Sequence, residues 1–205
     1  MNSRIRVLLA TSNTGKLREY RELARGSQLE LEVIPNFDEL PRFEESAPTF
    51  AENSAGKALH YSRFTGEIVL ADDSGLSVTA LGGAPGVLSA RYAGQHATDL
   101  DRMNKLLHQM QGVEGTGRRA RFICVTALAA RGRAMAVVSD FVAGLITREP
   151  RGGNGFGYDP IFIPEGLNHT FAEASHEEKN GLSHRGRAFR RIIAFMPEMG
   201  FEVWV

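Results

Sequence analysis

Short apolar runs alternate with polar turns along the first part of the chain, which predicts strands and helices in turn. Residues 5–10 (IRVLLA) and 29–35 (LELEVIP) have the composition of strands, and a proline ends the second. Between them, apolar residues recur at helical spacing and predict a helix whose buried face contains Leu17, Tyr20, Leu23 and Ala24. We therefore expect a strand, a helix and a second strand in this region.

A loop and a longer helix follow. Residues 36–48 are mostly polar and contain two prolines, so we expect a loop. Asn53 and Lys57, four positions apart, share one face of the helix that residues 49–64 predict. The inward residues expected for this helix are Phe50, Ala55, Ala58, Leu59 and Phe64.

The middle of the chain predicts a third strand, a loop and a capped helix. We expect the strand in EIVLADDSGLSV, which begins at Glu67, to end at its two aspartates. Residues 81–94 are punctuated by glycine and proline, which predicts a loop with one helical turn. Thr98 and Asp101 resemble a capping box, and they precede an apolar stripe made of Leu100, Met103, Leu107 and Met110.

The last part predicts a hairpin, a glycine-rich loop and a final helix. Two β-like runs, 119–130 and 133–147, are separated by Arg-Gly alone, which favours a hairpin. A helix that begins near Ser183 is expected to bury Phe189, Ile192, Ile193 and Met196. Strands and helices that alternate before a hairpin predict an α/β fold with a mixed sheet, and no linker separates independent domains.

Composition adds limits to this picture. The 205 residues carry 24 Lys plus Arg and 24 Asp plus Glu, so the formal net charge is zero. A neutral chain without a polybasic run argues against nucleic acid and membrane surfaces as partners. The single cysteine, Cys124, excludes an intrachain disulfide and is expected to be a buried small hydrophobe. No apolar run reaches the roughly 18 residues of a membrane span, so we expect a soluble cytoplasmic protein.

Residues 11–16 (TSNTGK) lie where a strand enters a helix, which is a common place to bind an anion. The first N–H groups of a helix have no partner within it, the helix dipole favours negative charge there, and Lys16 adds an ammonium group. The segment is not a P-loop, because the glycine and the Ser or Thr of that motif are missing at its spacing. The alternative is an ordinary turn capped by Ser12 or Asn13.

Asp72 and Asp73 follow a run of apolar residues. Successive side chains on a strand point to opposite faces, so one carboxylate can face a cleft at the edge of the sheet while the other supports a turn into Ser74. Mg²⁺ is usually held by one or two carboxylates together with waters and phosphate oxygens. The alternative is that Asp and Ser simply favour turns.

The loop EPRGGNGFGYDP, residues 149–160, contains four glycines that let the backbone approach a ligand closely. Phe156 and Tyr158 offer a stacking face for a base. The alternative is a flexible surface loop with two aromatic anchors.

His184 and Arg185 are expected in the first turn of the last helix. The helix dipole disfavours positive charge there, so we expect an anionic or polar partner to compensate. Three later arginines, Arg187, Arg190 and Arg191, are interpreted as a solvated face.

Five blocks occur in order between Ala10 and Ala188: ATSNTGK, TFAENSAGKA, ADDSGLSVTALGGAPGVLSARYAG, EPRGGNGFGYDPIF and EEKNGLSHRGRA. Together they resemble the inosine/xanthosine triphosphate pyrophosphatase family, although Ser12 and Asp140 stand where the family commonly has Gly. The resemblance implies one domain over residues 1–205, of α/β fold, with an elongated mixed sheet, two α/β lobes and a nucleotide-binding cleft between them. It also implies an enzyme that requires Mg²⁺ and is usually a homodimer.

The resemblance further implies the reaction and the residues that serve it. Non-standard purine nucleoside triphosphates (XTP, ITP and dITP) would be hydrolysed to monophosphate and pyrophosphate, which removes them from the nucleotide pool. Asp73 would be the catalytic general base and a metal ligand, with Glu45, or Glu44 as the alternative, as the second ligand. Implied substrate-binding residues are Thr11, Ser12, Asn13, Thr14, Gly15, Lys16, Ser74, Phe156, Gly157, Tyr158, Asp159, Lys179, His184 and Arg185.

We expect water to attack the α-phosphorus, and donors on His184 or Arg185 to pair with the 6-oxo group that adenine lacks. A non-catalytic nucleotide sensor is the alternative from another class, and the presence of Asp73 beside the Glu44–Glu45 pair disfavours it. A pyrophosphatase for modified pyrimidine nucleotides is a second alternative, which the SHR block and the FGYD loop disfavour.

Overall fold

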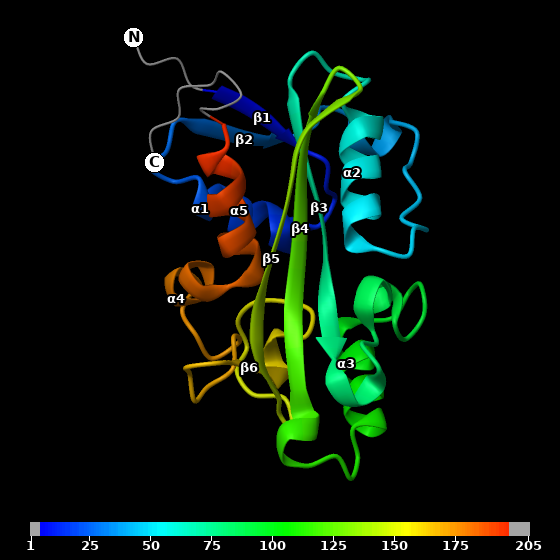
Figure 1. The fold of residues 1–205 in the computed structure, drawn as a ribbon, viewed down its shortest axis with the longest axis vertical. Coiled ribbons are helices and arrows are strands. Elements are labelled where there is room, and N and C mark those ends of the chain that lie inside the picture. Colours follow the sequence, from blue (N-terminus) through cyan, green and yellow to red (C-terminus); the bar gives the residue numbers. More distant parts are fainter. Residues whose placement is uncertain (1–4, 197–205) are drawn as a thin grey trace. The chain divides into compact units, whose positions relative to one another are not determined.

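A computed structural model describes residues 5–196 and shows a mixed α/β fold (Figure 1). Within these residues the strands form a six-stranded sheet in the order β2-β1-β3-β4-β5-β6, which confirms the predicted fold class. The strands are β1 (Ile5–Leu9), β2 (Leu29–Val33), β3 (Ile68–Val78), β4 (Arg119–Ala130), β5 (Arg133–Ile146) and β6 (Phe162–Pro164). The α-helices are α1 (Thr14–Leu23), α2 (Phe50–Tyr61), α3 (Asp99–Gln109), α4 (His176–Leu182) and α5 (His184–Ala194).

The chain divides into two compact units. Within the described residues, unit 1 consists of 5–73, 124–140 and 185–196, and unit 2 consists of 74–123 and 141–184. Each unit has its own apolar core.

Unit 1 has a sheet covered by helices on both faces. Side chains of β1 alternate, so that Val7 and Leu9 pack with α1 and α5, whereas Leu8 packs with α2. Figure 1 shows α1 and α5 together, with α2 apart from them. β1 pairs in parallel with both β2 and β3. Parallel strands buried on both faces read as continuous apolar runs, which is why the sequence pattern located β1 and the start of β3.

Unit 2 has a sheet covered on one face. Along β4, Ala120 and Phe122 are buried and pack with α3, whereas Arg119 and Arg121 are exposed on the other face. The predicted capping box of α3 is confirmed, because Thr98 and Asp101 bond each other's backbone N–H groups. The predicted apolar stripe is only partly buried: Met103 and Met110 are buried, Leu100 is 56% exposed, and the fully buried residue of the helix is Leu106, outside the stripe.

The predicted hairpin is confirmed. β4 and β5 are neighbours joined by Arg131 and Gly132, whose φ angles are 50° and 74°. Two consecutive positive φ angles are typical of the tight turn that matches strand twist. Asp140 lies within β5 and its carboxylate is 3.3 Å from Arg191.

Two predicted boundaries are wrong. β3 does not end at the aspartates but continues to Val78, because Leu76 and Val78 keep the buried alternation of a strand. α2 ends at Tyr61, so Phe64 lies beyond the helix and is 45% exposed. The buried face of α2 contains polar residues as well as apolar ones: Asn53, Ser54, Lys57, Ala58 and Tyr61.

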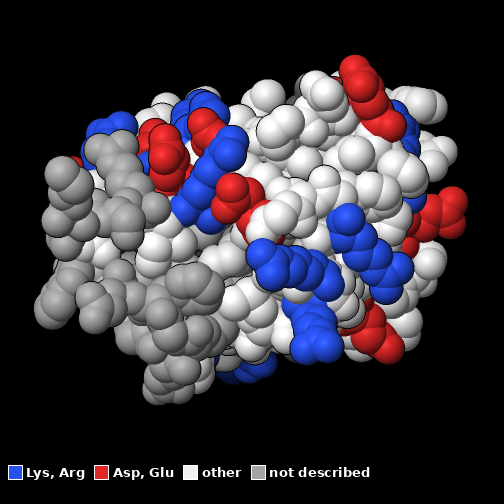
Figure 2. All heavy atoms as spheres, turned by 90° about the horizontal axis from the view of Figure 1, so that it is seen from above, with Lys and Arg blue, Asp and Glu red and all other residues white. Residues whose placement is uncertain are grey.

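Charges of both signs lie on the face of the molecule that Figure 2 draws. Figure 2 shows Lys and Arg side chains interspersed with Asp and Glu on the face that it draws. Among residues 5–196, no helix is both long and apolar enough to cross a membrane. The C-terminal segment MGFEVWV lies outside the described residues.

Candidate active site

The two adjacent carboxylates of β3 are both buried and have different partners. Asp72 and Asp73 are 2% and 6% exposed. Asp72 Oδ2 lies 3.0 Å from Lys16 Nζ and 3.3 Å from an Arg185 nitrogen, whereas Asp73 Oδ2 accepts a 3.0 Å hydrogen bond from Asn53. The alternation of side chains along a strand therefore places two like charges in separate surroundings.

Asp72 is a buried counter-ion. Burial alone would raise its pKa, but the charges of Lys16, Arg185 and Lys57 hold the pKa of this carboxyl well below its usual range. Arg185 is 2% exposed and also pairs with Glu19, so its guanidinium lies between two carboxylates. This confirms that an anionic partner compensates the positive charge at the start of α5.

Cys124 lies next to this ion-pair group. It is fully buried, and its Sγ lies 3.9 Å from Asp72 Oδ2. Burial raises the pKa of the thiol to about 12, so the group stays protonated and unreactive at neutral pH. The predicted burial of Cys124 is confirmed.

Asp73 has the properties of a proton acceptor. Burial and the neighbouring charge of Glu45 raise its pKa to about 6, against the opposing effects of Lys16, the Asn53 hydrogen bond and Lys57. A carboxylate with a pKa near neutrality combines a useful ionised fraction with appreciable basicity. Asp73 is therefore suited to take a proton from water.

Glu45 and Lys57 belong to the same largely buried polar group. We call this group the unit 1 cluster, and its other members are Lys16, Glu19, Asn53, Asp72, Asp73 and Arg185. The Lys57 ammonium pairs with Glu45 and donates a 2.7 Å hydrogen bond to the carbonyl oxygen of Asp72. Burial lowers the pKa of Lys57, but the carboxylates, with Glu45 first, outweigh this effect and raise it. Glu45 is partly buried and acts electrostatically on Asp73, whereas Glu44 is exposed. Of the two alternatives for the second metal ligand, the structure brings Glu45 into the cluster.

The chemistry of the cluster fits a divalent cation. Among the described residues no group of three or more His, Cys, Asp and Glu side chains gathers. Mg²⁺ needs only one or two protein carboxylates, because waters and phosphate oxygens supply the other ligands. Glu45 and Asp73 are close enough for the charge of one to raise the pKa of the other, and a cation between them would remove that repulsion.

The predicted phosphate turn has the geometry of a capped helix start. Asn13 Oδ1 accepts a 3.0 Å hydrogen bond from the Lys16 N–H, and Thr11 Oγ1 accepts one of 3.1 Å from the Asn13 N–H. Thr14 and Gly15 are the first two residues of α1, so their N–H groups have no partner within the helix. Of the two predicted caps, the structure selects Asn13.

A second group of predicted residues lies in unit 2. Lys179 Nζ is 2.5 Å from Asp159 Oδ2 and 4.9 Å from the centre of the Phe156 ring. The same Asp159 oxygen accepts a 2.8 Å hydrogen bond from the Phe156 N–H. Gly155 makes this possible, because a Cβ there would lie 2.1 Å from Asp159 Oδ2. The ammonium and the aromatic ring are thus held side by side.

His184 stacks on Phe122 in unit 2, with ring centres 4.8 Å apart and an angle of 8° between the rings. Tyr158 is 4% exposed and donates a 3.0 Å hydrogen bond to the Ser89 carbonyl, so it belongs to the core. Of the two aromatic residues predicted to stack on a base, Phe156 is therefore the one outside the core. Gly157 and Ser74 were also predicted. Gly157 follows Phe156, and its N–H donates a hydrogen bond to Asp99. Ser74 lies on β3.

The predictions missed three buried residues that belong to the unit 1 cluster: Glu19, Asn53 and Lys57. The only signal for the last two was their four-residue spacing on a helix whose other inward residues are small or apolar. Their burial depends on how α2 packs against β3, and no local pattern in the sequence shows this packing.

The Ham1 family matches residues 7–195, which is nearly the whole described chain. The chain belongs to the Ham1 family. A protein of Bacillus licheniformis named dITP/XTP pyrophosphatase is 45% identical over 94% of this chain and 98% of its own length. One of the same name from Streptococcus thermophilus is also 45% identical, but this chain spans only 59% of its length.

Solved structures agree with this assignment. The structure of a Ham1 protein from Coxiella burnetii has a TM-score of 0.82 and 42% identity, and the match covers 95% of this chain and 99% of that one. The resemblance inferred from the five sequence blocks is therefore confirmed at the level of the family.

Proposed function

We propose that this protein is a dITP/XTP pyrophosphatase, an enzyme that hydrolyses non-standard purine nucleoside triphosphates (XTP, ITP and dITP) to the monophosphate and pyrophosphate. Membership of the Ham1 family and the names of its relatives support this activity. The observation that carries it is Asp73, a buried carboxylate beside Glu45 whose pKa is raised to about 6 in the metal-free protein.

The triphosphate would bind at the start of α1. The helix dipole and the first N–H groups of Thr14 and Gly15 favour an anion there, and Lys16 supplies a positive charge. These groups would orient the α-phosphorus in line with the attacking water.

Glu45 and Asp73 would hold Mg²⁺, which when bound offsets the charge on the phosphate oxygens and on the leaving pyrophosphate. Asp73 takes the proton as a water oxygen forms a bond to the α-phosphorus. The bond between that phosphorus and the bridging oxygen to the β-phosphorus breaks, and pyrophosphate leaves with the electron pair. Asp72, which stays ionised between Lys16 and Arg185, holds the two cations in place.

The base would be recognised by the unit 2 group. Phe156 offers a stacking face, and His184 is the candidate donor to the 6-oxo group of hypoxanthine and xanthine. Arg185 was the other predicted donor, but its guanidinium already pairs with Glu19 and Asp72. Its role is therefore better explained as a support for Asp72.

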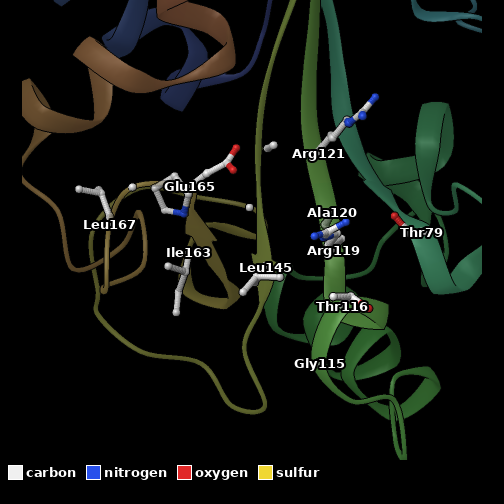
Figure 3. Close-up of a pocket in the computed structure, with 14 residues that line it drawn as sticks. Thr79, Gly115, Thr116, Arg119, Ala120, Arg121, Leu145, Ile163, Glu165 and Leu167 are labelled. Carbon is white, nitrogen blue, oxygen red and sulfur yellow. The ribbon is translucent and has the colours of Figure 1, made fainter.

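We also propose that the enzyme is cytoplasmic and forms a homodimer. An exposed surface in unit 2 supports the dimer: Phe141 and Leu145 on β5 are 44% and 45% exposed. Leu145 also lines a groove of about 800 Å³, and Figure 3 shows Arg121 of β4 on one side of Leu145 and Glu165 on the other. A second copy related by a two-fold axis would place each arginine opposite the partner's glutamate.

Product analysis tests the activity. The purified protein is incubated with dITP, XTP, ATP and dGTP, with and without Mg²⁺, and pyrophosphate and orthophosphate are measured separately. We expect pyrophosphate from dITP and XTP at rates far above those for ATP and dGTP, and only with Mg²⁺. Orthophosphate as the product would place the attack at the γ-phosphorus and contradict the mechanism. Tight dITP binding without turnover would contradict it in favour of a sensor.

A further inference from the structure

We infer that Asn53 is a positioning residue, which holds the two carboxylates of the proposed metal site, Glu45 and Asp73, at a fixed separation. The inference rests on the proposed function, because it concerns the Mg²⁺ site that the activity needs. Asn53 lies on α2, is 1% exposed, and was predicted from the sequence only as part of a helix face.

The side-chain amide of Asn53 uses both of its ends. Its Nδ2 donates to Asp73 Oδ2 at 3.0 Å and to the Ala47 carbonyl at 3.3 Å, and its Oδ1 accepts from the Ala47 N–H at 2.9 Å. The opposite orientation would put Oδ1 against a carboxylate and Nδ2 against an N–H, so the contacts fix the amide in one orientation.

These contacts join two segments far apart in sequence. Ala47 follows Glu45 by two residues in a stretch without regular secondary structure, and Asp73 lies on β3. One turn further along α2, Lys57 pairs with Glu45 itself. α2 therefore links the Glu45 segment to Asp73, because one side chain of this helix, Asn53, bonds both.

Other links also fasten this stretch to α2. The Phe43 N–H donates to the Tyr61 hydroxyl at 3.2 Å, and His60 bonds the Pro41 carbonyl at 2.6 Å. Asn53 differs from Tyr61 and His60 because it also donates to Asp73. Loss of its amide should therefore leave the stretch attached but let the two carboxylates move relative to each other.

Ser54 provides a matched control. It is the next residue of α2, is fully buried, and its Oγ donates a 3.2 Å hydrogen bond to the Ala71 carbonyl of β3. Ser54→Ala thus removes a buried link between the same helix and the same strand without touching either carboxylate. A purely structural role of Asn53 would make the two alanine variants behave alike.

The experiment compares Asn53→Ala, Ser54→Ala and the wild type. Calorimetric titration with MgCl₂ without nucleotide measures cation affinity, and steady-state kinetics with dITP separate kcat from KM. We expect Asn53→Ala to bind Mg²⁺ about 10–100-fold more weakly and to lose kcat by a similar factor, since residues that support metal ligands typically have effects of this size. KM for dITP should change less, and Ser54→Ala should match the wild type in both measurements.

The inference is overturned if Asn53→Ala binds Mg²⁺ like the wild type, or if Ser54→Ala weakens binding as much. Asn53→Gln keeps a buried amide but displaces it by one methylene group, and it gives the same comparison if the alanine variant does not fold. A wild-type protein that neither binds Mg²⁺ nor releases pyrophosphate would refute the proposed function, and this inference with it. A wild type active with Mg²⁺ beside an unaffected Asn53→Ala would refute the inference alone.

Discussion

Asp72 and Asp73 are neighbours of the same type with opposite acid–base behaviour. The pKa of Asp72 lies well below its usual range, because Lys16 and Arg185 outweigh the effect of burial. The pKa of Asp73 is raised to about 6, because burial and Glu45 act in the same direction. The pleat of β3 separates the two residues into a structural counter-ion and a candidate base.

The raised pKa of Asp73 predicts that this residue destabilises the metal-free protein at neutral pH. A carboxyl whose pKa is higher in the folded state than its ordinary value of 3.8 contributes stability below that value, and the contribution is lost as the pH rises through about 6. Asp73→Asn should therefore raise the free energy of unfolding at pH 8 in a chelator, by on the order of 2 kcal/mol. Urea unfolding at pH 8 and pH 4 measures this, and the gain should disappear at pH 4.

The same variant should release pyrophosphate from dITP about 10²–10⁴-fold more slowly than the wild type, because the positioned base is lost. Asp72→Asn is the contrast: it removes a partner of Lys16 and Arg185, and should lower the free energy of unfolding at pH 8 by on the order of 3 kcal/mol. If Asp73→Asn were also destabilised at pH 8, the interpretation that the ionised Asp73 carboxylate destabilises the folded protein would be wrong.

The roles of single residues were predictable from the sequence where one continuous chain segment determines their surroundings. Lys16 beside a helix start and two acids after an apolar run are local patterns. Asn53 and Lys57 were not predicted as part of the site, because their burial depends on the carboxylates of β3 and of the Glu45 stretch. Such polar residues are stable inside only when their partners arrive from elsewhere.

At the scale of whole elements, the predictions succeeded where the pattern was long. The runs of β4 and β5 and the stripe of α5 gave the correct elements. β6 has three residues and α4 has seven, so neither contains enough repeats to reveal a period. The end of β3 was misplaced because Asp, Ser and Gly usually mark turns, whereas here burial of Leu76 and Val78 overrides that preference.

The pairing of β5 with the short strand β6 depends on a glycine. Gly144 faces Pro164 in the antiparallel register, and a Cβ at Gly144 would lie 2.2 Å from the Ile163 carbonyl oxygen. Gly144→Ala should therefore lower the free energy of unfolding by about 1–3 kcal/mol, the usual range for overpacking. Gly153→Ala is the control, because nothing lies within 4 Å of its added Cβ. Equal urea unfolding midpoints for the two variants would show that β6 adapts without cost.

At the scale of the whole molecule, zero net charge means that a tetra-anionic nucleotide must be met by local charge. The unit 1 cluster contains more carboxylates than cations, so without a metal it is not positively charged. Bound Mg²⁺ would reverse that sign where the triphosphate arrives, which is a physical reason for the proposed metal dependence. The charged residues of the cluster are Lys16, Lys57 and Arg185 together with Glu19, Glu45, Asp72 and Asp73.

If the proposed homodimer forms through the exposed unit 2 surface, a carboxylate introduced in the middle of that surface should prevent two chains from associating. Leu145→Glu would bury a charge between two copies, so light scattering at micromolar concentration should give the mass of a monomer. Leu100→Glu is the matched control, because this leucine is 56% exposed on α3 and lies outside the groove, and its mass should stay that of a dimer.

A charge exchange tests the two-fold arrangement itself. Arg121→Glu should weaken the dimer by setting like charges opposite each other, and adding Glu165→Arg should restore it, since every pair across the axis then has opposite signs again. A monomeric wild type would refute the dimer. A dimer that neither Leu145→Glu nor the single charge change affects would place the interface on another surface.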